Sequence, residues 1–206
     1  MQRSRLRRLH SIAGVVPLGV FLGFHLFVNS SAKGGADAYN ATVHRLQQLP
    51  LLGAVEILCL MAPLVFHGVT GLFLIATVPV ASERATRAGR ALAVFQRVTG
   101  ALVFAFVLFH LWTTRLVQFG DHESVDLFHL VQAALANPWI RTAYVLGILG
   151  VTGHLAAGLY AFTQTWDLAR TPRTRAFVAA AAAGVFLTLA AIGLSTLAAF
   201  RLPNPV

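Results

Sequence analysis

The sequence predicts an all-α integral membrane protein in which five transmembrane helices form one bundle. Of the residues, 57% are hydrophobic and only 11% are charged, whereas about a quarter charged is usual for a soluble domain. The mean hydropathy of +0.71 indicates the same class. Five apolar runs are long enough to cross a bilayer, for which about 20 residues are typical. We therefore expect residues 1–206 to form a single transmembrane domain, with no room for a separate soluble catalytic domain.

Charged or polar segments separate the predicted spans, which cover approximately residues 11–32, 51–82, 96–117, 140–167 and 175–200. The first span follows a basic N-terminus like that of a signal peptide. We expect it to be retained, because its apolar run is long enough to span and no convincing cleavage site closes it. The third is the clearest, since seventeen residues without a formal charge lie between Arg97 and Arg115. The fifth contains no ionisable side chain from residue 176 to residue 200.

Two long connections are expected on the side opposite the N-terminus, roughly 33–50 and 115–141. Part of the second, residues 122–138, is predicted to form a short surface helix that ends at Asn137-Pro138. Cys59 is the single cysteine. It excludes an internal disulfide and a Cys-based zinc site.

Arginines gather at one end of the predicted spans, and this asymmetry predicts the orientation. Eleven of the sixteen basic residues lie on the N-terminal side: Arg3, Arg5, Arg7, Arg8, Arg84, Arg87, Arg90, Arg97, Arg170, Arg173 and Arg175. The positive-inside rule makes that side cytoplasmic, and five spans then place the C-terminus outside the cell membrane. The net charge of +9 is therefore interpreted as a topology signal. We expect contact with a lipid bilayer and none with nucleic acid.

Four consecutive spans each carry one histidine among apolar residues: His25, His67, His110 and His154. An ionisable ring inside a membrane is costly and is a functional candidate by default. At about 1.5 Å of rise per residue, His25 and His110 lie roughly 8 Å below the outer boundary. His67 and His154 lie roughly 18 to 24 Å below it. The four histidines therefore form an outer and an inner layer, each with two members.

Two histidine pairs at two depths are what two stacked haems b would need, because each iron takes one imidazole from each face. This pattern predicts an outer haem between His25 and His110 and an inner haem between His67 and His154. Other interpretations stay open, since a single buried histidine is more often a hydrogen-bonded core residue, and proton relays also use such residues. A proton-coupled transporter is a further class, although internal repeats and broken helices are not evident.

Small residues share a face with His154 on the fourth span, at Gly147, Gly150 and Gly158. This stripe suits a flat macrocycle approaching the helix. It equally suits close packing between membrane helices.

Seven segments, in their order and spacing, resemble the cytochrome b membrane-anchor subunits of succinate:quinone oxidoreductases, in the form with one five-helix subunit and two haems b. They are Arg8–Ser11, His25 with Val28-Asn29, Pro63–Gly71, Phe95–Gly100, His110–Arg115, His154–Trp166 and Thr171–Arg173. The resemblance covers nearly the whole chain. Another dihaem b protein, of the hydrogenase or ferric reductase type, would share the histidines but not the Arg8–Ser11 and Gln96–Gly100 elements.

The resemblance implies that the chain is no stand-alone enzyme. It would anchor a flavoprotein with covalently bound FAD and an iron–sulfur subunit at the cytoplasmic face, where succinate is oxidised to fumarate. Electrons would pass through the inner haem and then the outer haem to a quinone, with menaquinone as the expected type. Some fumarate reductases of this family carry a glutamate on the fifth span for proton transfer. Its absence here favours succinate oxidation.

Two further groups of polar residues are candidates for the sites that the resemblance implies. Haem propionate pairing or docking of the iron–sulfur subunit is expected at the inner ends of the spans, from Arg8, His10, Ser11, Arg97 and Arg173. The alternative is that these arginines only hold topology. A quinone pocket near the outer boundary would be lined by Asn29, His44, Glu56 and Arg115, with Glu56 or His44 handling protons. The alternative for each is an ordinary interfacial residue.

Overall fold

The computed structural model describes residues 2–80, 86–116 and 126–201, and every regular element in these ranges is a helix. Five helices in these ranges are long and apolar enough to cross a membrane, and they cover Ser4–Gly34, Leu52–Thr77, Arg87–Thr114, Pro138–Thr165 and Pro172–Ala199. The predicted fold class, an all-α protein with five membrane spans, is therefore confirmed.

Four of the five spanning helices begin earlier than predicted, at Ser4, Arg87, Pro138 and Pro172, because helices continue into the membrane–water interface. The third begins at Arg87, where the Thr86 hydroxyl accepts a hydrogen bond from the amide of Gly89 and caps the first turn. The second differs, because its helix ends at Thr77 and not near residue 82. Val78 is extended, with φ −116° and ψ 133°, as expected for a residue that precedes a proline.

In the described ranges, three spans contain a widened π-helical turn; one of these turns contains Pro17 and another ends two residues before Pro63. The first span consists of α1 (Gln2–Ala13), η1 (Gly14–Leu18), α2 (Gly19–Asn29) and the 3₁₀ turn η2 (Ser30–Gly34). The second consists of α4 (Leu52–Val55), η3 (Glu56–Met61) and α5 (Ala62–Thr77), and the third of α6 (Arg87–Leu111) and η4 (Trp112–Leu116). Pro17 lies inside η1. Proline lacks an amide hydrogen and its ring collides with the carbonyl four residues earlier, which explains a local widening.

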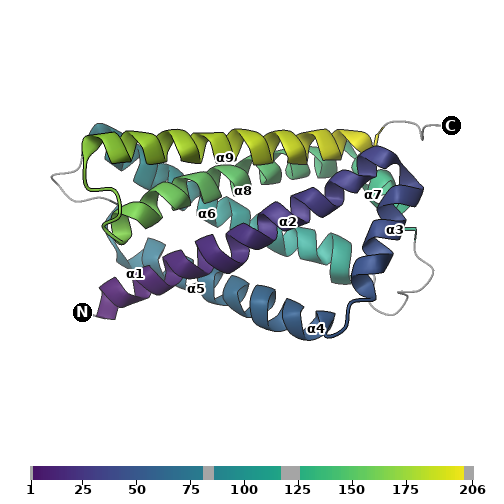
Figure 1. Ribbon diagram of the computed structural model, residues 1–206, viewed down its shortest axis with the longest axis horizontal. Helices are drawn as coiled ribbons and strands as arrows, with labels where there is room; N and C mark the ends of the chain where they lie inside the picture. Colours follow the sequence, from purple (N-terminus) through teal and green to yellow (C-terminus); the bar gives the residue numbers. More distant parts are fainter. Residues whose placement is uncertain (1, 81–85, 117–125, 202–206) are drawn as a thin grey trace.

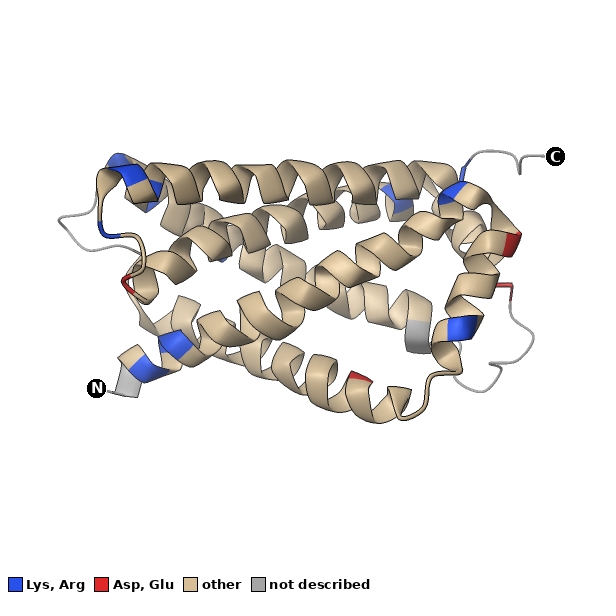
Figure 2. Cartoon of the chain, viewed as in Figure 1, with Lys and Arg blue, Asp and Glu red and all other residues tan. Residues whose placement is uncertain are grey.

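The first span crosses the bundle diagonally. Its first half, α1, packs on α5 and on α8 (Pro138–Thr165), and its second half, α2, packs against α9 (Pro172–Ala199). Figure 1 shows α8 and α9 side by side, with α1 starting at one end of the bundle and α9 finishing at the other. Lysine and arginine lie toward the two ends, and most of the long middle section carries no charged residue (Figure 2).

The most buried part of the protein lies at the end of the bundle where α9 finishes. The helices α3 (Ala36–Gln47) and α7 (Leu127–Ala136) fold over this end. Their apolar side chains meet those of α8 and α9 in a cluster that includes Tyr39, Phe128, Leu135, Leu197 and Phe200. Phe128 and Leu135 are each only 1% exposed. The predicted helix before Asn137 is therefore present, but one of its faces is buried, and residues 122–125 of the prediction lie outside the described ranges.

Candidate functional site

The four intramembrane histidines form two facing pairs. The rings of His25 on α2 and His110 on α6 have centroids 5.8 Å apart, with an interplanar angle of 81°. The rings of His67 on α5 and His154 on α8 have centroids 6.2 Å apart, again at 81°. The structure thus brings together the same two pairs that were predicted from depth.

These distances match the geometry of an iron atom with two imidazole ligands. Each metal–nitrogen bond is about 2 Å and each nitrogen lies about 1 Å from its ring centroid, so the two centroids would be about 6 Å apart. Among the described residues, no group of three or more His, Cys, Asp or Glu side chains could hold a metal ion. Axial ligation of a haem iron needs only two histidines.

Hydrogen bonds select the tautomer of both inner histidines. Nδ1 of His67 lies 3.0 Å from the carbonyl oxygen of His10, which can only accept, so this nitrogen carries the hydrogen. Nδ1 of His154 lies 3.2 Å from the Thr99 hydroxyl. That hydroxyl donates to the carbonyl of Phe95 at 2.7 Å, so its oxygen accepts from His154. Each Nε2 is therefore left with the lone pair that a metal requires.

Two glycines make room for the inner histidines. A Cβ at Gly14 would overlap the ring of His67, and a Cβ at Gly100 would lie 2.9 Å from Cε1 of His154. Neither histidine could keep its position beside an alanine. The inner site therefore requires glycine, which has no side chain, at positions 14 and 100.

The glycine stripe on α8 serves helix packing. A Cβ at Gly147 would overlap the ring of Phe106, and one at Gly150 would lie 3.5 Å from Val103. Both contacts are with α6, which packs closely along α8. A Cβ at Gly158 would likewise lie 3.4 Å from the Gln96 amide on α6. Of the two interpretations of this stripe, the contacts support close helix packing.

His10 belongs to the inner site. Its ring stacks on that of His67, with centroids 3.9 Å apart and planes 9° from parallel. Its Nδ1 lies 3.1 Å from the Thr70 hydroxyl, and a Cβ at Gly71 would lie 3.1 Å from its Cε1. The predicted role at the surface, in docking or propionate pairing, would require another orientation of this ring.

The outer histidines have a different set of partners. Nδ1 of His110 lies 3.3 Å from the Tyr144 hydroxyl, which lies 3.2 Å from the Thr113 hydroxyl. Beside His25, the Asn29 amide donates to the His25 carbonyl at 2.7 Å, and its nitrogen lies 3.4 and 3.5 Å from the two ring nitrogens. Tyr39 donates to the Asn29 side-chain oxygen at 3.2 Å. Burial, and then the nearby Tyr144, raise the pKa of Tyr39 to about 12, so it stays a donor at neutral pH.

At the inner end, two of the predicted residues contact the end of α8. Arg8 lies over the Trp166 ring, 5.1 Å from its centroid. Ser11 donates to the Arg8 carbonyl at 2.8 Å and accepts from Trp166 Nε1 at 3.1 Å. These contacts join α1 to the end of α8. Arg173 lies in the first turn of α9 and is exposed.

Arg97 caps the end of α5. Its guanidinium donates to the carbonyl oxygens of Val78 at 2.6 Å and Pro79 at 2.8 Å, with a longer contact of 3.4 Å to Ile75. Cations favour the C-terminal end of a helix, where carbonyl groups lack intrahelical partners. This arginine therefore has a structural function where the chain leaves the second span.

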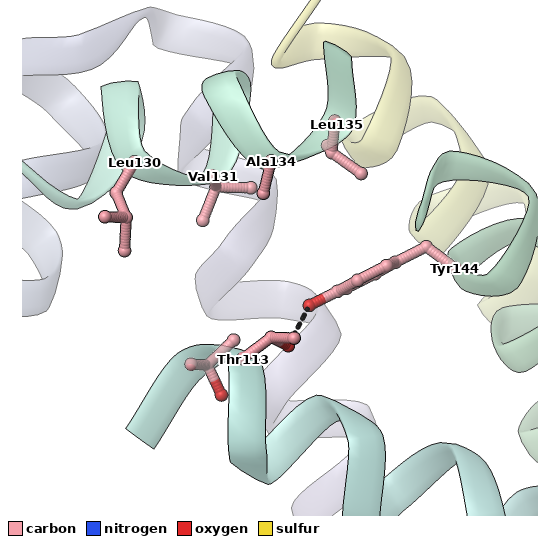
Figure 3. Close-up of a pocket in the computed structure, with 7 residues that line it drawn as sticks. Thr113, Leu130, Val131, Ala134, Leu135 and Tyr144 are labelled. Atoms are coloured by element: carbon pink, nitrogen blue, oxygen red, sulfur yellow. Dashed lines mark hydrogen bonds between the residues drawn. The ribbon is translucent and has the colours of Figure 1, made fainter. Parts of the chain in front are cut away.

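Three of the four predicted quinone residues lie in the described part of the chain with their side chains. Asn29 lies beside His25, His44 is exposed on α3, and Glu56 is half-buried at the start of η3. The side chain of Arg115 lies outside the described part of the chain. A cavity of about 30 Å³ near His110 is lined, among the described side chains, by Thr113, Thr114, Leu130, Val131, Ala134, Leu135 and Tyr144, and not by Asn29, His44 or Glu56 (Figure 3). Such a volume can hold a water molecule but not a quinone ring.

Sequence reasoning missed Thr99 and Tyr144, whose hydroxyl groups contact histidine rings, and Thr113, whose hydroxyl group contacts that of Tyr144. Their signal was a hydroxyl side chain within an apolar helix near the depth of a histidine. Hydroxyl groups are common in membrane helices, where they often bond to their own backbone. The signal therefore becomes informative only when the neighbouring helix is known.

The sequence matches a known membrane family over more than half of its length. Residues 76–191 match the family described as succinate dehydrogenase/fumarate reductase transmembrane subunit. Over 195 residues, the chain is 35% identical to the succinate dehydrogenase cytochrome b558 subunit of Bacillus subtilis (strain 168), which covers 94% of this chain and 95% of that protein. No solved structure matches the chain significantly.

Proposed function

Because the chain belongs to the family of succinate dehydrogenase/fumarate reductase transmembrane subunits, we propose that it holds two haems b and conducts electrons between succinate-oxidising partner subunits and a quinone. The observation that carries this proposal is the presence of two histidine pairs. The two rings face each other in each pair, with centroids 5.8 Å apart in one and 6.2 Å apart in the other. When bound, a haem with two axial histidines supplies a one-electron redox centre whose potential depends on its surroundings.

The chain's own residues prepare the inner site. His67 and His154 present Nε2, while their Nδ1 hydrogens are donated to the His10 carbonyl and the Thr99 hydroxyl. Such outer hydrogen bonds fix ring orientation and raise ligand basicity. Gly14 keeps the space beside the His67 ring free. Together these residues favour one orientation of each ligand.

The outer site would be held by His25 and His110, close to the end covered by α3 and α7. This end also contains Asn29, His44, Glu56 and Arg115, and we propose that these residues contribute to a quinone site there. Menaquinone is the expected substrate. The cavity beside Tyr144 is too small for the ring, so the quinone would approach from the membrane face.

Partner subunits would dock at the end of the bundle where α1 begins. A flavoprotein with FAD and an iron–sulfur protein are the partners that a succinate dehydrogenase membrane subunit implies, and Arg8 and Arg173 are exposed at this end. The positive-inside rule places this end in the cytoplasm and the end of α9 outside. Electrons would then pass from the iron–sulfur subunit to the inner pair, to the outer pair and to the quinone. The fifth span lacks ionisable residues between Phe177 and Phe200, and we therefore propose turnover in the direction of succinate oxidation.

Purification of the chain from its native membrane tests this function. We expect a flavoprotein and an iron–sulfur protein to co-purify, and succinate to reduce a b-type absorption band in the complex. A band reduced by hydrogen but not by succinate would instead identify another class of dihaem b protein. A purified complex with no b-type band would contradict the proposal, and a proton-coupled transporter would then be the class to test.

A further inference from the structure

Tyr144 joins the outer ligand His110 to a second hydroxyl group on the facing helix. Its hydroxyl lies 3.3 Å from Nδ1 of His110 and 3.2 Å from Thr113 Oγ1 (Figure 3 shows the second contact). Its ring packs edge-on against Phe106, Phe109 and His110, at centroid distances of 5.6, 6.1 and 5.7 Å. The tyrosine is therefore held by ring contacts as well as by hydrogen bonds.

The direction of these hydrogen bonds follows from the groups around them. Thr113 donates to the carbonyl oxygens of Phe109 and His110, each at 3.1 Å. Its oxygen is then free to accept, and Tyr144 is the donor to it. The Tyr144 oxygen in turn accepts from Nδ1 of His110. This chain of donors leaves Nε2 of His110 as the nitrogen with a free lone pair.

We propose that Tyr144 is a positioning residue that fixes the tautomer of His110 and, through the basicity of that ligand, lowers the reduction potential of the outer haem. The inference rests on the proposed function, because it presupposes a haem between His25 and His110. An imidazole that donates from Nδ1 is a stronger electron donor through Nε2, and this favours the oxidised metal.

The two outer histidines differ in their hydrogen-bond partners, so Tyr144 acts on His110 and not on His25. The amide nitrogen of Asn29, a donor, lies 3.4 Å from Nδ1 and 3.5 Å from Nε2 of His25. At the inner site, by contrast, both Nδ1 atoms face acceptors, the His10 carbonyl and the Thr99 hydroxyl. Among the described residues, Tyr144 is thus the one side chain placed to accept from an outer ligand. Its loss should affect one haem and not the other.

Redox titration of the intact complex with Tyr144→Phe tests the inference. Phenylalanine keeps the ring contacts and removes only the hydroxyl. We expect the outer couple to become easier to reduce by about tenfold in equilibrium constant, which is about 59 mV for one electron, while the inner couple is unchanged. Tyr160→Phe, the same change near the other end of α8, should shift neither couple. An unchanged outer couple, or an equal shift of both, would overturn the role of Tyr144.

Thr113→Val provides a second variant in case Tyr144→Phe fails to assemble. It removes the acceptor of the Tyr144 hydroxyl, and we expect a smaller shift in the same direction, whereas Thr113→Ser should restore the native potential. If the outer couple of Thr113→Val has the native potential, the inference is wrong. These outcomes are distinct from a failure of the proposed function, which would appear as the absence of two b-type couples in the unmodified complex.

Discussion

The backbone carbonyl of His10 accepts a hydrogen bond from Nδ1 of His67 at 3.0 Å, although 57 positions separate the two residues in sequence. The ring of His10 stacks on that of His67 at 3.9 Å. The start of the first span therefore fixes the tautomer and the orientation of His67, a proposed haem ligand on the second span. This relationship predicts that changes in α1 and η1 will affect the inner site more than the outer one.

Gly14→Ala should selectively disturb the inner haem. The new Cβ would overlap the His67 ring, and such overpacking typically costs about 1–3 kcal/mol. Gly23→Ala is the matched control on the same span, because a Cβ at Gly23 would have no neighbouring atom within 4 Å. Haem content and the reduced-minus-oxidised spectrum measure the effect. Equal losses in both variants would contradict the assignment of Gly14 to the inner site.

Arg97→Ala should loosen the end of α5. The substitution removes the donor to the carbonyl oxygens of Val78 and Pro79, and we expect a loss of about 1 kcal/mol in local stability. Hydrogen exchange of the last amides of α5 measures this. Arg97→Lys keeps the charge but not the forked geometry, so it should restore only part of the protection. If the amides of α5 were fully protected in Arg97→Lys, the positive charge alone would account for the stabilisation.

Asp126 should make a pH-dependent contribution to the stability of α3 and α7, the two helices that fold over the outer end of the bundle. Hydrogen bonds from Asn40, and then from His129, lower the pKa of Asp126 from its ordinary 3.8 to about 2. Because the folded pKa is the lower one, this contribution is present above about pH 4 and is lost as the pH falls toward 2. Asp126 also caps α7 by accepting from the His129 amide at 3.1 Å.

The Asp126→Ala variant should therefore unfold more easily than the native protein at pH 7, by about 1 kcal/mol as for other helix caps. The half-exposed position of Asp126 argues against a larger value. The difference between the two proteins should shrink as the pH falls from 4 toward 2. Thermal unfolding at several pH values measures it, and a constant difference across that range would show that the carboxylate charge has no part in it.

Hydropathy and charge were sufficient to predict the membrane spans, because the cost of placing polar groups in lipid restricts the sequence directly. The same cost identified His25, His67, His110 and His154 as functional candidates. Their pairing could be predicted because rise per residue converts position into depth. The helix end at Thr77 was missed, although Pro79 carried the signal.

Contacts between distant helices could not be predicted in this way. Nothing in the sequence near His10 shows that its carbonyl meets His67, or that Thr99 accepts from His154. Helix α3 was also missed, because its Tyr39 faces the buried cluster while its other residues resemble a polar loop. Such features depend on which helix faces which, and that follows from packing of the whole bundle.

Haem analysis of the four single variants His25→Ala, His67→Ala, His110→Ala and His154→Ala, beside the native complex, tests the central claim most directly. The native chain should contain two haems b. The His67 and His154 variants should each lose the inner haem and keep the outer one, and the His25 and His110 variants should do the reverse. A native chain with fewer than two haems, or two members of one pair that lose different haems, would contradict the account.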